Sequence, residues 1–209
     1  MRSLLLHPHA KKVLLVFCCL PFILFVYKII YDDLGPNPAE ALIRGTGDWS
    51  IRFLCFVLLV TPLRVFTNTP ALIRFRRIIG VSVFAYGTLH LLCYSGFDME
   101  FEWGDILKDI TKRPFILVGF LGWLFLSLMA ITSTNAAIKW MGVARWHQLH
   151  KLVYAVAVLA VIHFYWMKSA KHNYQEVIVY ATILGGLLFW RFLRWIQERV
   201  KQNRESIHI

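Results

Sequence analysis

The sequence predicts an all-α integral membrane protein, a bundle of six membrane-spanning helices that forms one domain over residues 1–209. Composition gives the first reason, because 58% of the residues are hydrophobic and only 17% are charged, against about 25% charged residues in ordinary soluble domains. The second reason is that the apolar residues form continuous stretches. A membrane β-barrel would instead alternate polar and apolar residues in strands of about ten residues.

Each of the six stretches is close to the length of about 20 residues that crosses a bilayer, and interfacial side chains complete the shorter ones. The first stretch follows Lys11 and Lys12, as a signal peptide does, but the small-residue pattern Ala39-Glu-Ala41 lies well beyond it. We therefore expect a retained helix. The six stretches are residues 13–31, 51–66, 78–94, 115–131, 152–167 and 177–195.

The basic residues predict that both termini are cytoplasmic. The N-terminus, the second and fourth loops and the C-terminus carry 15 of the 23 Lys and Arg residues but only two of the 12 acids. Positive residues gather on the cytoplasmic side of membrane proteins. Topology and contact with membrane lipid thus explain the net charge of +11, and we expect no nucleic-acid partner. The four cysteines lie in apolar stretches without a CxxC pair, so no zinc site or disulfide framework is expected.

Two histidines at matching depth predict a haem site. His90 lies four residues before the outer end of the third stretch, and His163 lies five residues before Lys168 at the outer end of the fifth. Two neutral imidazoles that face each other inside a bundle can serve as the axial ligands of a b-type haem. The other histidines except His150 lie in tails, loops or just outside a stretch: His7, His9, His147, His172 and His208.

His150 lies at the opposite, cytoplasmic end of the fifth stretch. Thirteen residues separate it from His163, which on one continuous helix means about 20 Å and roughly 140° of rotation. Either the fifth helix is irregular or the two histidines serve sites on different flanks. Arg76, fourteen residues before His90, is the expected neighbour of His150, so a second haem there would lack its second histidine.

Arg74, Arg76 and Arg77 allow two interpretations. They fit a topology signal that also contacts anionic lipid, and they fit an anion site for the phosphate of flavin mononucleotide (FMN) or for a haem propionate. Gly80 and Gly87 share one face of the third stretch. Their missing side chains would let a flat macrocycle approach the backbone, although close helix packing explains them equally well.

Several chemistries lack their residues in this sequence. No GxGxxG or GxxxxGK pattern occurs, so we do not expect NAD(P)H binding. No HExxH or HxxxH pattern occurs either, which argues against zinc-dependent hydrolysis. The six apolar stretches contain no carboxylate, and this argues against a proton pump or a cation transporter.

Three segments resemble the MsrQ (YedZ) family, which belongs to the ferric reductase-like transmembrane superfamily that also includes the NADPH oxidases. The most specific features are Arg-Arg-x-x-Gly at the start of the third stretch, His90, the Thr-Ser-Thr after the fourth stretch, and Trp-His-Gln-Leu-His at the start of the fifth. The resemblance covers nearly the whole chain. The three segments are LIRFRRIIGVSVFAYGTLHLLCY, TKRPFILVGFLGWLFLSLMAITST and ARWHQLHKLVYAVAVLAVIHFYW.

The resemblance implies an electron conduit of the bacterial inner membrane. Family members pass electrons from the quinone pool, or from a cytosolic flavin reductase, to MsrP, a periplasmic molybdopterin enzyme that reduces methionine sulfoxide in oxidised proteins. It implies haem b, one or two per chain, and FMN as cofactors. His90 and His163 would hold the outer haem and His150 an inner redox group, whose second histidine is replaced by Arg76. The superfamily's flavin and nicotinamide domain is missing, so electrons would come from another molecule.

Two other functions stay open from the sequence. One is a free-standing ferric or superoxide-forming reductase, in which the outer haem gives electrons to a small acceptor. The other is a cofactor-free channel, transporter or assembly factor.

Overall fold

Six helices are long and apolar enough to cross a membrane in the computed structural model, which describes residues 6–7, 9–169 and 174–207. The prediction of an all-α bundle with six such helices is confirmed, and no strand occurs in these ranges. His172 and His208 lie outside them. The spanning helices are α2 (His9–Ile30), α3 (Pro38–Phe66), α4 (Arg76–Cys93), α6 (Pro114–Ile131), α9 (Leu152–Ser169) and α10 (Gln175–Ile207).

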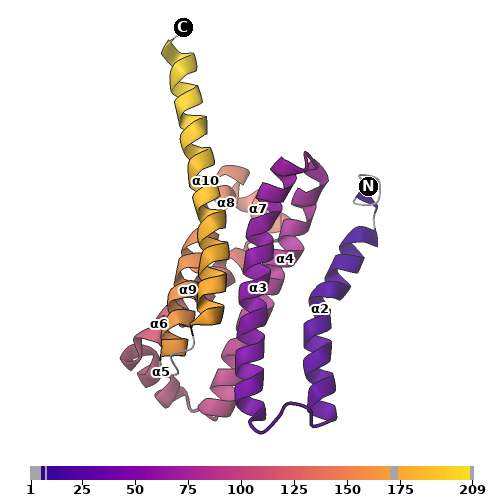
Figure 1. Ribbon diagram of the computed structural model, residues 1–209, viewed down its shortest axis with the longest axis vertical. Helices are drawn as coiled ribbons and strands as arrows, with labels where there is room; N and C mark the ends of the chain where they lie inside the picture. Colours follow the sequence, from indigo (N-terminus) through magenta and orange to yellow (C-terminus); the bar gives the residue numbers. More distant parts are fainter. Residues whose placement is uncertain (1–5, 8, 170–173, 208–209) are drawn as a thin grey trace.

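Shorter elements lie at the two ends of the bundle. The short helix α5 (Trp103–Lys112) marks one end, which we call the α5 end, and both ends of the chain lie toward the opposite end, which we call the terminal end (Figure 1). The 3₁₀ helix η1 (Pro70–Phe75) leads into α4, and the π-helical turn η2 (Tyr94–Asp98) follows it. Two further short helices, α7 (Asn135–Met141) and α8 (Val143–Leu149), connect α6 to α9.

Hydrogen bonds hold helix α2 against α4 near Pro21. A proline inside a helix has no N–H to donate and disturbs the hydrogen bonds of the turn before it. The Tyr86 hydroxyl of α4 enters α2 at this point. It accepts a hydrogen bond from the Phe22 amide (2.9 Å) and donates one to the Cys18 carbonyl (2.9 Å). One side chain thus satisfies two backbone groups of α2 and fixes its position against the bundle.

Helix α3 begins at Pro38, well before residue 51, where the predicted stretch starts. Its first turn is capped, because the Asn37 side chain accepts a hydrogen bond from the Glu40 amide (3.1 Å) and proline occupies the first helical position. Asp48 consequently lies inside a helix that is a candidate membrane span. The expectation that no spanning segment contains a carboxylate was wrong, because the helix extends beyond the purely apolar residues.

The acidic third loop folds as the amphipathic helix α5. Its buried face carries Ile106 and Asp109. Asp109 accepts a hydrogen bond from the Tyr94 hydroxyl (2.5 Å) and pairs with Arg113 (2.7 Å), so these contacts tie α5 to the adjoining ends of α4 and α6. Its exposed face carries apolar as well as acidic side chains, among them Leu107.

The predicted fifth span, residues 152–167, lies within α9, and His150 and Lys151 lie before it, in a break between the end of α8 and the start of α9. The rotation calculated for a continuous helix therefore does not apply. The segment is irregular at this break, and His150 and His163 also lie at different sites, so both explanations offered by the sequence apply.

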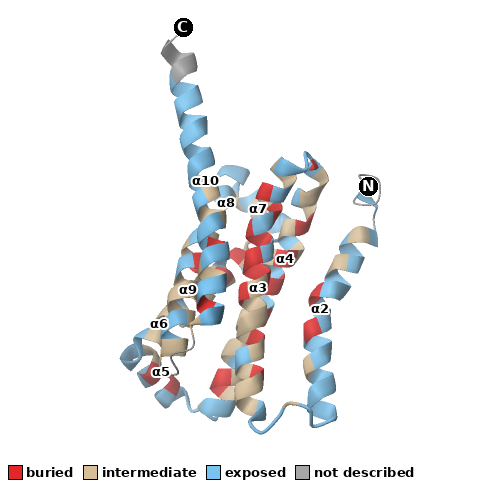
Figure 2. Ribbon diagram, in the orientation of Figure 1, coloured by how far each residue is buried: buried red, intermediate tan, exposed pale blue. Residues whose placement is uncertain are grey.

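The core lies where α3 and α4 pack together, and α9 packs along α6. The buried residues gather in the middle of the bundle, whereas the outward faces of α2 and α10 are exposed (Figure 2). Large apolar side chains such as Phe17 and Phe189 are exposed on these faces. Outward apolar faces are expected of helices that contact lipid, because lipid tails are as apolar as the side chains.

Candidate functional site

His90 of α4 and His163 of α9 lie side by side near the α5 end. Their ring centroids are 6.1 Å apart and their planes are nearly perpendicular, at 81°. The prediction that the two helices bring these side chains together at one depth is confirmed. We call them the histidine pair.

Each ring of the histidine pair is held by a backbone carbonyl on a neighbouring helix. His90 Nδ1 lies 2.8 Å from the Ile43 carbonyl of α3, and His163 Nδ1 lies 2.7 Å from the Phe115 carbonyl of α6. A carbonyl only accepts, so each Nδ1 carries the proton and each Nε2 keeps a free lone pair. Histidines that bind metals almost always donate their other ring N–H in this way.

A glycine makes room for each ring, one turn after the carbonyl. A Cβ on Gly47 would lie 3.1 Å from His90 Nδ1, and a Cβ on Gly119 would lie 2.7 Å from His163 Cε1. The same arrangement thus occurs twice: a carbonyl at position i and a glycine at i+4 contact one imidazole. We call each carbonyl and glycine a cradle: Ile43 with Gly47, and Phe115 with Gly119. Neither glycine is evident from the sequence, because only the packing of α3 on α4 and of α6 on α9 brings them to the imidazoles.

The predicted glycines, Gly80 and Gly87, have other neighbours. A Cβ on Gly87 would meet Ser50 Oγ at 3.4 Å and Leu126 at 3.6 Å, and a Cβ on Gly80 would meet only Val57, at 3.8 Å. These are ordinary van der Waals separations. Neither glycine touches an imidazole, and their contacts are those of helix packing.

The geometry of the histidine pair fits a metal ion held between two trans nitrogen ligands. Two nitrogens at about 2 Å from one ion place their ring centroids about 6 Å apart. In the described part of the chain, no group of three or more His, Cys, Asp or Glu side chains could hold a metal. The remaining ligands would therefore belong to the metal's own cofactor, as in a planar macrocycle. The two cradles and the neutral donor set fit haem.

The terminal end contains a second group of residues, which we call the inner cluster: Arg76, His150, Tyr154 and Arg191. His150 lies within hydrogen-bond distance of Thr132 Oγ1 (3.3 Å) and packs against Trp146, with ring centroids 4.1 Å apart. Arg76 is close enough to the other three to interact with each electrostatically. Arg76 is thus the neighbour of His150 that the sequence predicts.

Two guanidinium groups meet in the inner cluster, and no carboxylate within the described ranges forms an ion pair with either. Arg76 Nε is buried and has no hydrogen-bond partner among the described residues. Arg191 donates to two backbone carbonyls, those of Leu58 and of Leu187. Buried cations are costly without a counter-charge, so this arrangement suits an anionic group.

The three arginines that the sequence singled out point to different surroundings. Arg77 is exposed and donates to Asn135 of α7 (2.8 Å), and Arg74 lies over the ring of Phe75. Arg76 belongs to the inner cluster, whereas Arg77 acts on His150 only through its charge, from the exposed side. Arg191 was missed, because it lies in the sixth apolar stretch, more than 100 residues from Arg76, and no pattern links the two.

Comparison with known proteins identifies the family. The model of the ferric reductase like transmembrane component matches residues 46–161, a range that contains Gly47, His90, Gly119 and His150. The chain is 56% identical to a protein of Polaromonas naphthalenivorans over 97% of its own length and 93% of the relative's. It is 43% identical to one from Herminiimonas arsenicoxydans, covering 92% and 88% of the two chains.

A third relative, from Caulobacter vibrioides, is 41% identical over 83% of this chain and 82% of its own. All three relatives carry the name protein-methionine-sulfoxide reductase heme-binding subunit MsrQ. On this similarity, the chain belongs to the ferric reductase-like transmembrane proteins and, within them, to the MsrQ family.

Proposed function

We propose that this protein is a haem-binding electron-transfer subunit of the bacterial inner membrane. It takes electrons from the quinone pool, or from a cytosolic flavin reductase, and passes them to a periplasmic molybdopterin reductase of the MsrP type, which repairs methionine sulfoxide in oxidised proteins. The observation that carries the proposal is the histidine pair, with ring centroids 6.1 Å apart and both Nδ1 atoms hydrogen-bonded to carbonyls.

His90 and His163 are the proposed axial ligands of a haem b. When bound, haem supplies an iron centre that gains and loses one electron at a time. Gly47 and Gly119 leave space for the rings, and the Ile43 and Phe115 carbonyls fix the tautomer in which each Nε2 keeps a free lone pair that would hold the metal.

The charge distribution supports an orientation with both termini in the cytoplasm. The α5 end, and with it the histidine pair, would then face the periplasm. Helix α5 and the turn before it carry acids that include Glu100, Glu102 and Asp105, with Asp105 64% exposed. We propose this acidic surface as the docking site of the periplasmic partner, because complementary charge speeds encounter between proteins.

The inner cluster is the proposed site of an anionic cofactor group on the cytoplasmic side, either the FMN phosphate or the propionate of a second haem. Arg76 would donate to it from the buried Nε that has no partner within the described chain, and Arg191 would add a second positive charge. His150 would face the same group as a ligand or hydrogen-bond donor.

The decisive experiment measures electron transfer to the partner. The purified protein is reduced chemically in detergent, and the haem absorption bands are followed after addition of MsrP-type reductase with methionine sulfoxide. The proposal predicts reoxidation that requires both additions. Equally rapid reoxidation by ferric chelates or oxygen without the partner would instead support a free-standing reductase, and absence of a Soret band would support a cofactor-free membrane protein.

A further inference from the structure

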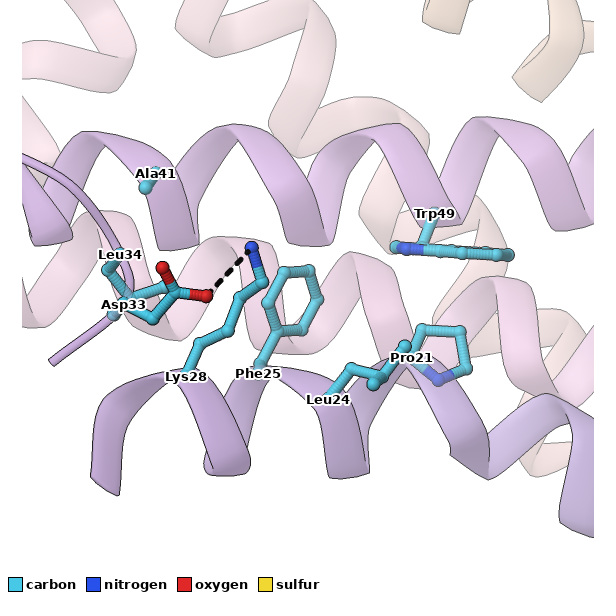
Figure 3. A pocket seen from close by; sticks show the side chains of 8 residues that line it. All are labelled: Pro21, Leu24, Phe25, Lys28, Asp33, Leu34, Ala41 and Trp49. Atoms are coloured by element: carbon cyan, nitrogen blue, oxygen red, sulfur yellow. Dashed lines mark ion pairs between the residues drawn. The ribbon is translucent and has the colours of Figure 1, made fainter. Parts of the chain in front are cut away.

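A cavity of about 240 Å³ lies between α2 and α3 (Figure 3). Helix α2 contributes a face that includes Pro21, Phe25 and Lys28, helix α3 contributes Ala41 and Trp49, and the connection between the helices adds Asp33. The cavity is smaller than the roughly 300–1,000 Å³ of sites for drug-sized ligands, so it has room for a single substituted ring.

One face of α3 forms a wall of the cavity. It carries Ala41, Gly45 and Trp49, which follow one another at four-residue spacing. A Cβ on Gly45 would lie 2.7 Å from the ring of Phe25, which shows that this ring packs directly against the α3 backbone. Helix α2 forms the opposite wall, and hydrogen bonds to the Tyr86 hydroxyl of α4 hold it in place at Pro21. The position of the α2 wall therefore does not depend on α3 alone.

Polar groups are present at opposite ends of an otherwise apolar cavity. Lys28 and Asp33 lie at one end, paired at 3.8 Å with side chains that are 47% and 69% exposed. Such a long, solvated ion pair is weak, so either partner is available to a ligand. Trp49 lies at the other end, and Figure 3 shows its indole nitrogen on the side of the ring that faces Phe25 and Lys28. This N–H has no acceptor in the ranges that the structure describes.

We infer that this cavity binds the head group of a lipid-soluble para-quinone or its quinol. Such a ring is flat and uncharged and has oxygen atoms on two opposite edges. Lys28 would donate to one oxygen and the Trp49 indole N–H to the other, while Asp33 would accept a hydrogen bond from a quinol hydroxyl. The isoprenoid tail would leave between α2 and α3 into lipid, where the outward face of α2 is apolar and exposed.

Other lipid components match these groups less well. A phospholipid phosphate would meet the Asp33 carboxylate beside the only cation of the lining, and an acyl chain would leave both N–H donors without partners. An acyl chain fits better in another cavity, of about 570 Å³, which is lined by apolar surface of α9 and α10 around Ile162 and Ala181.

The inference rests on the proposed function, because it locates the electron donor of that function. Gly47 touches His90 on one face of α3, and Trp49, two residues further, lines the cavity. The quinone ring and the histidine pair would therefore lie on opposite sides of one helix, whose diameter is about 10 Å. Donor and acceptor sites would both lie in the half of the bundle near the α5 end.

Photolabelling tests this inference without relying on haem. The protein in lipid nanodiscs is irradiated with an azido-substituted short-chain quinone, and labelled peptides are identified by mass spectrometry. We expect labels on α2 or α3 around the cavity, which excess unlabelled quinone suppresses. Ala41→Phe, which fills the cavity, should lower this labelling about tenfold, the equivalent of about 1.4 kcal/mol of binding. Ala181→Phe, the same change in the α9–α10 cavity, should leave it unchanged.

A second variant covers the case in which Ala41→Phe does not fold. Trp49→Phe keeps the aromatic wall and removes the N–H, so it should also weaken labelling, at an unchanged gel-filtration profile. Labels on α9 and α10 instead of α2 and α3 would overturn the inference. Labelling of α2 and α3 that unlabelled quinone does not suppress would also overturn it and would indicate lipid in the α2–α3 cavity.

The readouts separate this inference from the proposed function. Specific labelling of α2 and α3 in a protein that binds no haem would support the quinone site and contradict the electron-transfer role. A protein with a normal haem spectrum that no quinone labels at α2 or α3 would overturn the quinone site alone.

Discussion

The histidine pair and the inner cluster occupy opposite halves of one bundle and differ in almost every physical respect. The pair consists of two neutral rings, each with its own carbonyl and glycine, in helices that run uninterrupted past them. The inner cluster has one imidazole at a break between two helices, together with two half-buried guanidinium groups. A neutral site of nitrogen donors suits a metal ion, whereas a buried site with excess positive charge suits an anion.

The comparison also separates geometry from charge as the source of selectivity. At the histidine pair, selectivity comes from fixed distances and from the space that the two glycines leave. In the inner cluster it comes from uncompensated charge, which tolerates ligands of several shapes. Substitutions at the two sites should therefore affect different cofactors, and the predictions below test that independence.

The largest effect is expected when one axial ligand is removed. His90→Ala or His163→Ala should reduce the haem content of the purified protein about tenfold or more, because one imidazole alone leaves the metal with an open axial position. Haem is quantified by its pyridine adduct. His147→Ala is the matched control, since His147 lies outside the pair and packs against Trp146. Equal haem in all three variants would refute the ligand assignment.

A methyl group in one cradle should have the next largest effect. Gly119→Ala places a Cβ 2.7 Å from the His163 ring, and Gly47→Ala places one 3.1 Å from the His90 ring. Overpacking of this kind costs about 1–3 kcal/mol, so Gly119→Ala should weaken haem binding about tenfold in a titration of the apoprotein, and Gly47→Ala should weaken it less. Gly122→Ala, on the same helix, should bind haem normally because its Cβ meets only Leu159, at 3.9 Å. A loss with Gly122→Ala that matches the loss with Gly119→Ala would contradict the cradle.

Loss of charge in the inner cluster should leave the histidine pair intact. Arg76→Gln should lower FMN binding about tenfold, because it removes a charge-assisted donor, while the Soret band assigned to the pair stays unchanged. Arg77→Gln, an exposed change nearby, should alter neither. FMN retention after gel filtration measures the effect. If Arg76→Gln instead stabilised the protein and left flavin and haem content unchanged, the guanidinium would have no anionic partner.

The smallest effect is expected from Tyr86→Phe, which lies outside both sites. It removes the two hydrogen bonds that hold α2 to α4, and the Phe22 N–H and the Cys18 carbonyl, four residues apart, can then bond each other, so we expect a loss of about 0.5–1.5 kcal/mol in the free energy of unfolding. Thermal unfolding in detergent should shift downward at constant haem content. Tyr27→Phe, at an exposed position of α2, is the control. A loss of haem in Tyr86→Phe would show that the position of α2 also affects the histidine pair.

The sequence predicts the six spanning helices and the histidine pair because both depend on local quantities, namely apolar length and distance from a helix end. It does not predict Gly47 and Gly119, since their role depends on which faces of α3 and α6 meet the imidazoles. Arg191 lies far from Arg76 along the chain, and only the packing of α10 brings it close. The break at His150 lies just before the predicted fifth stretch, so it contradicts only the continuous helix assumed for the rotation between His150 and His163.

The central claim, that His90 and His163 hold one metal from opposite sides, is tested most directly by low-temperature electron paramagnetic resonance of the oxidised, haem-loaded protein. The 81° angle between the two ring planes predicts a low-spin ferric signal of the strongly anisotropic type given by perpendicular axial imidazoles, lost in His90→Ala and in His163→Ala. A high-spin signal from the wild-type protein, or a low-spin signal that survives both substitutions, would contradict the claim.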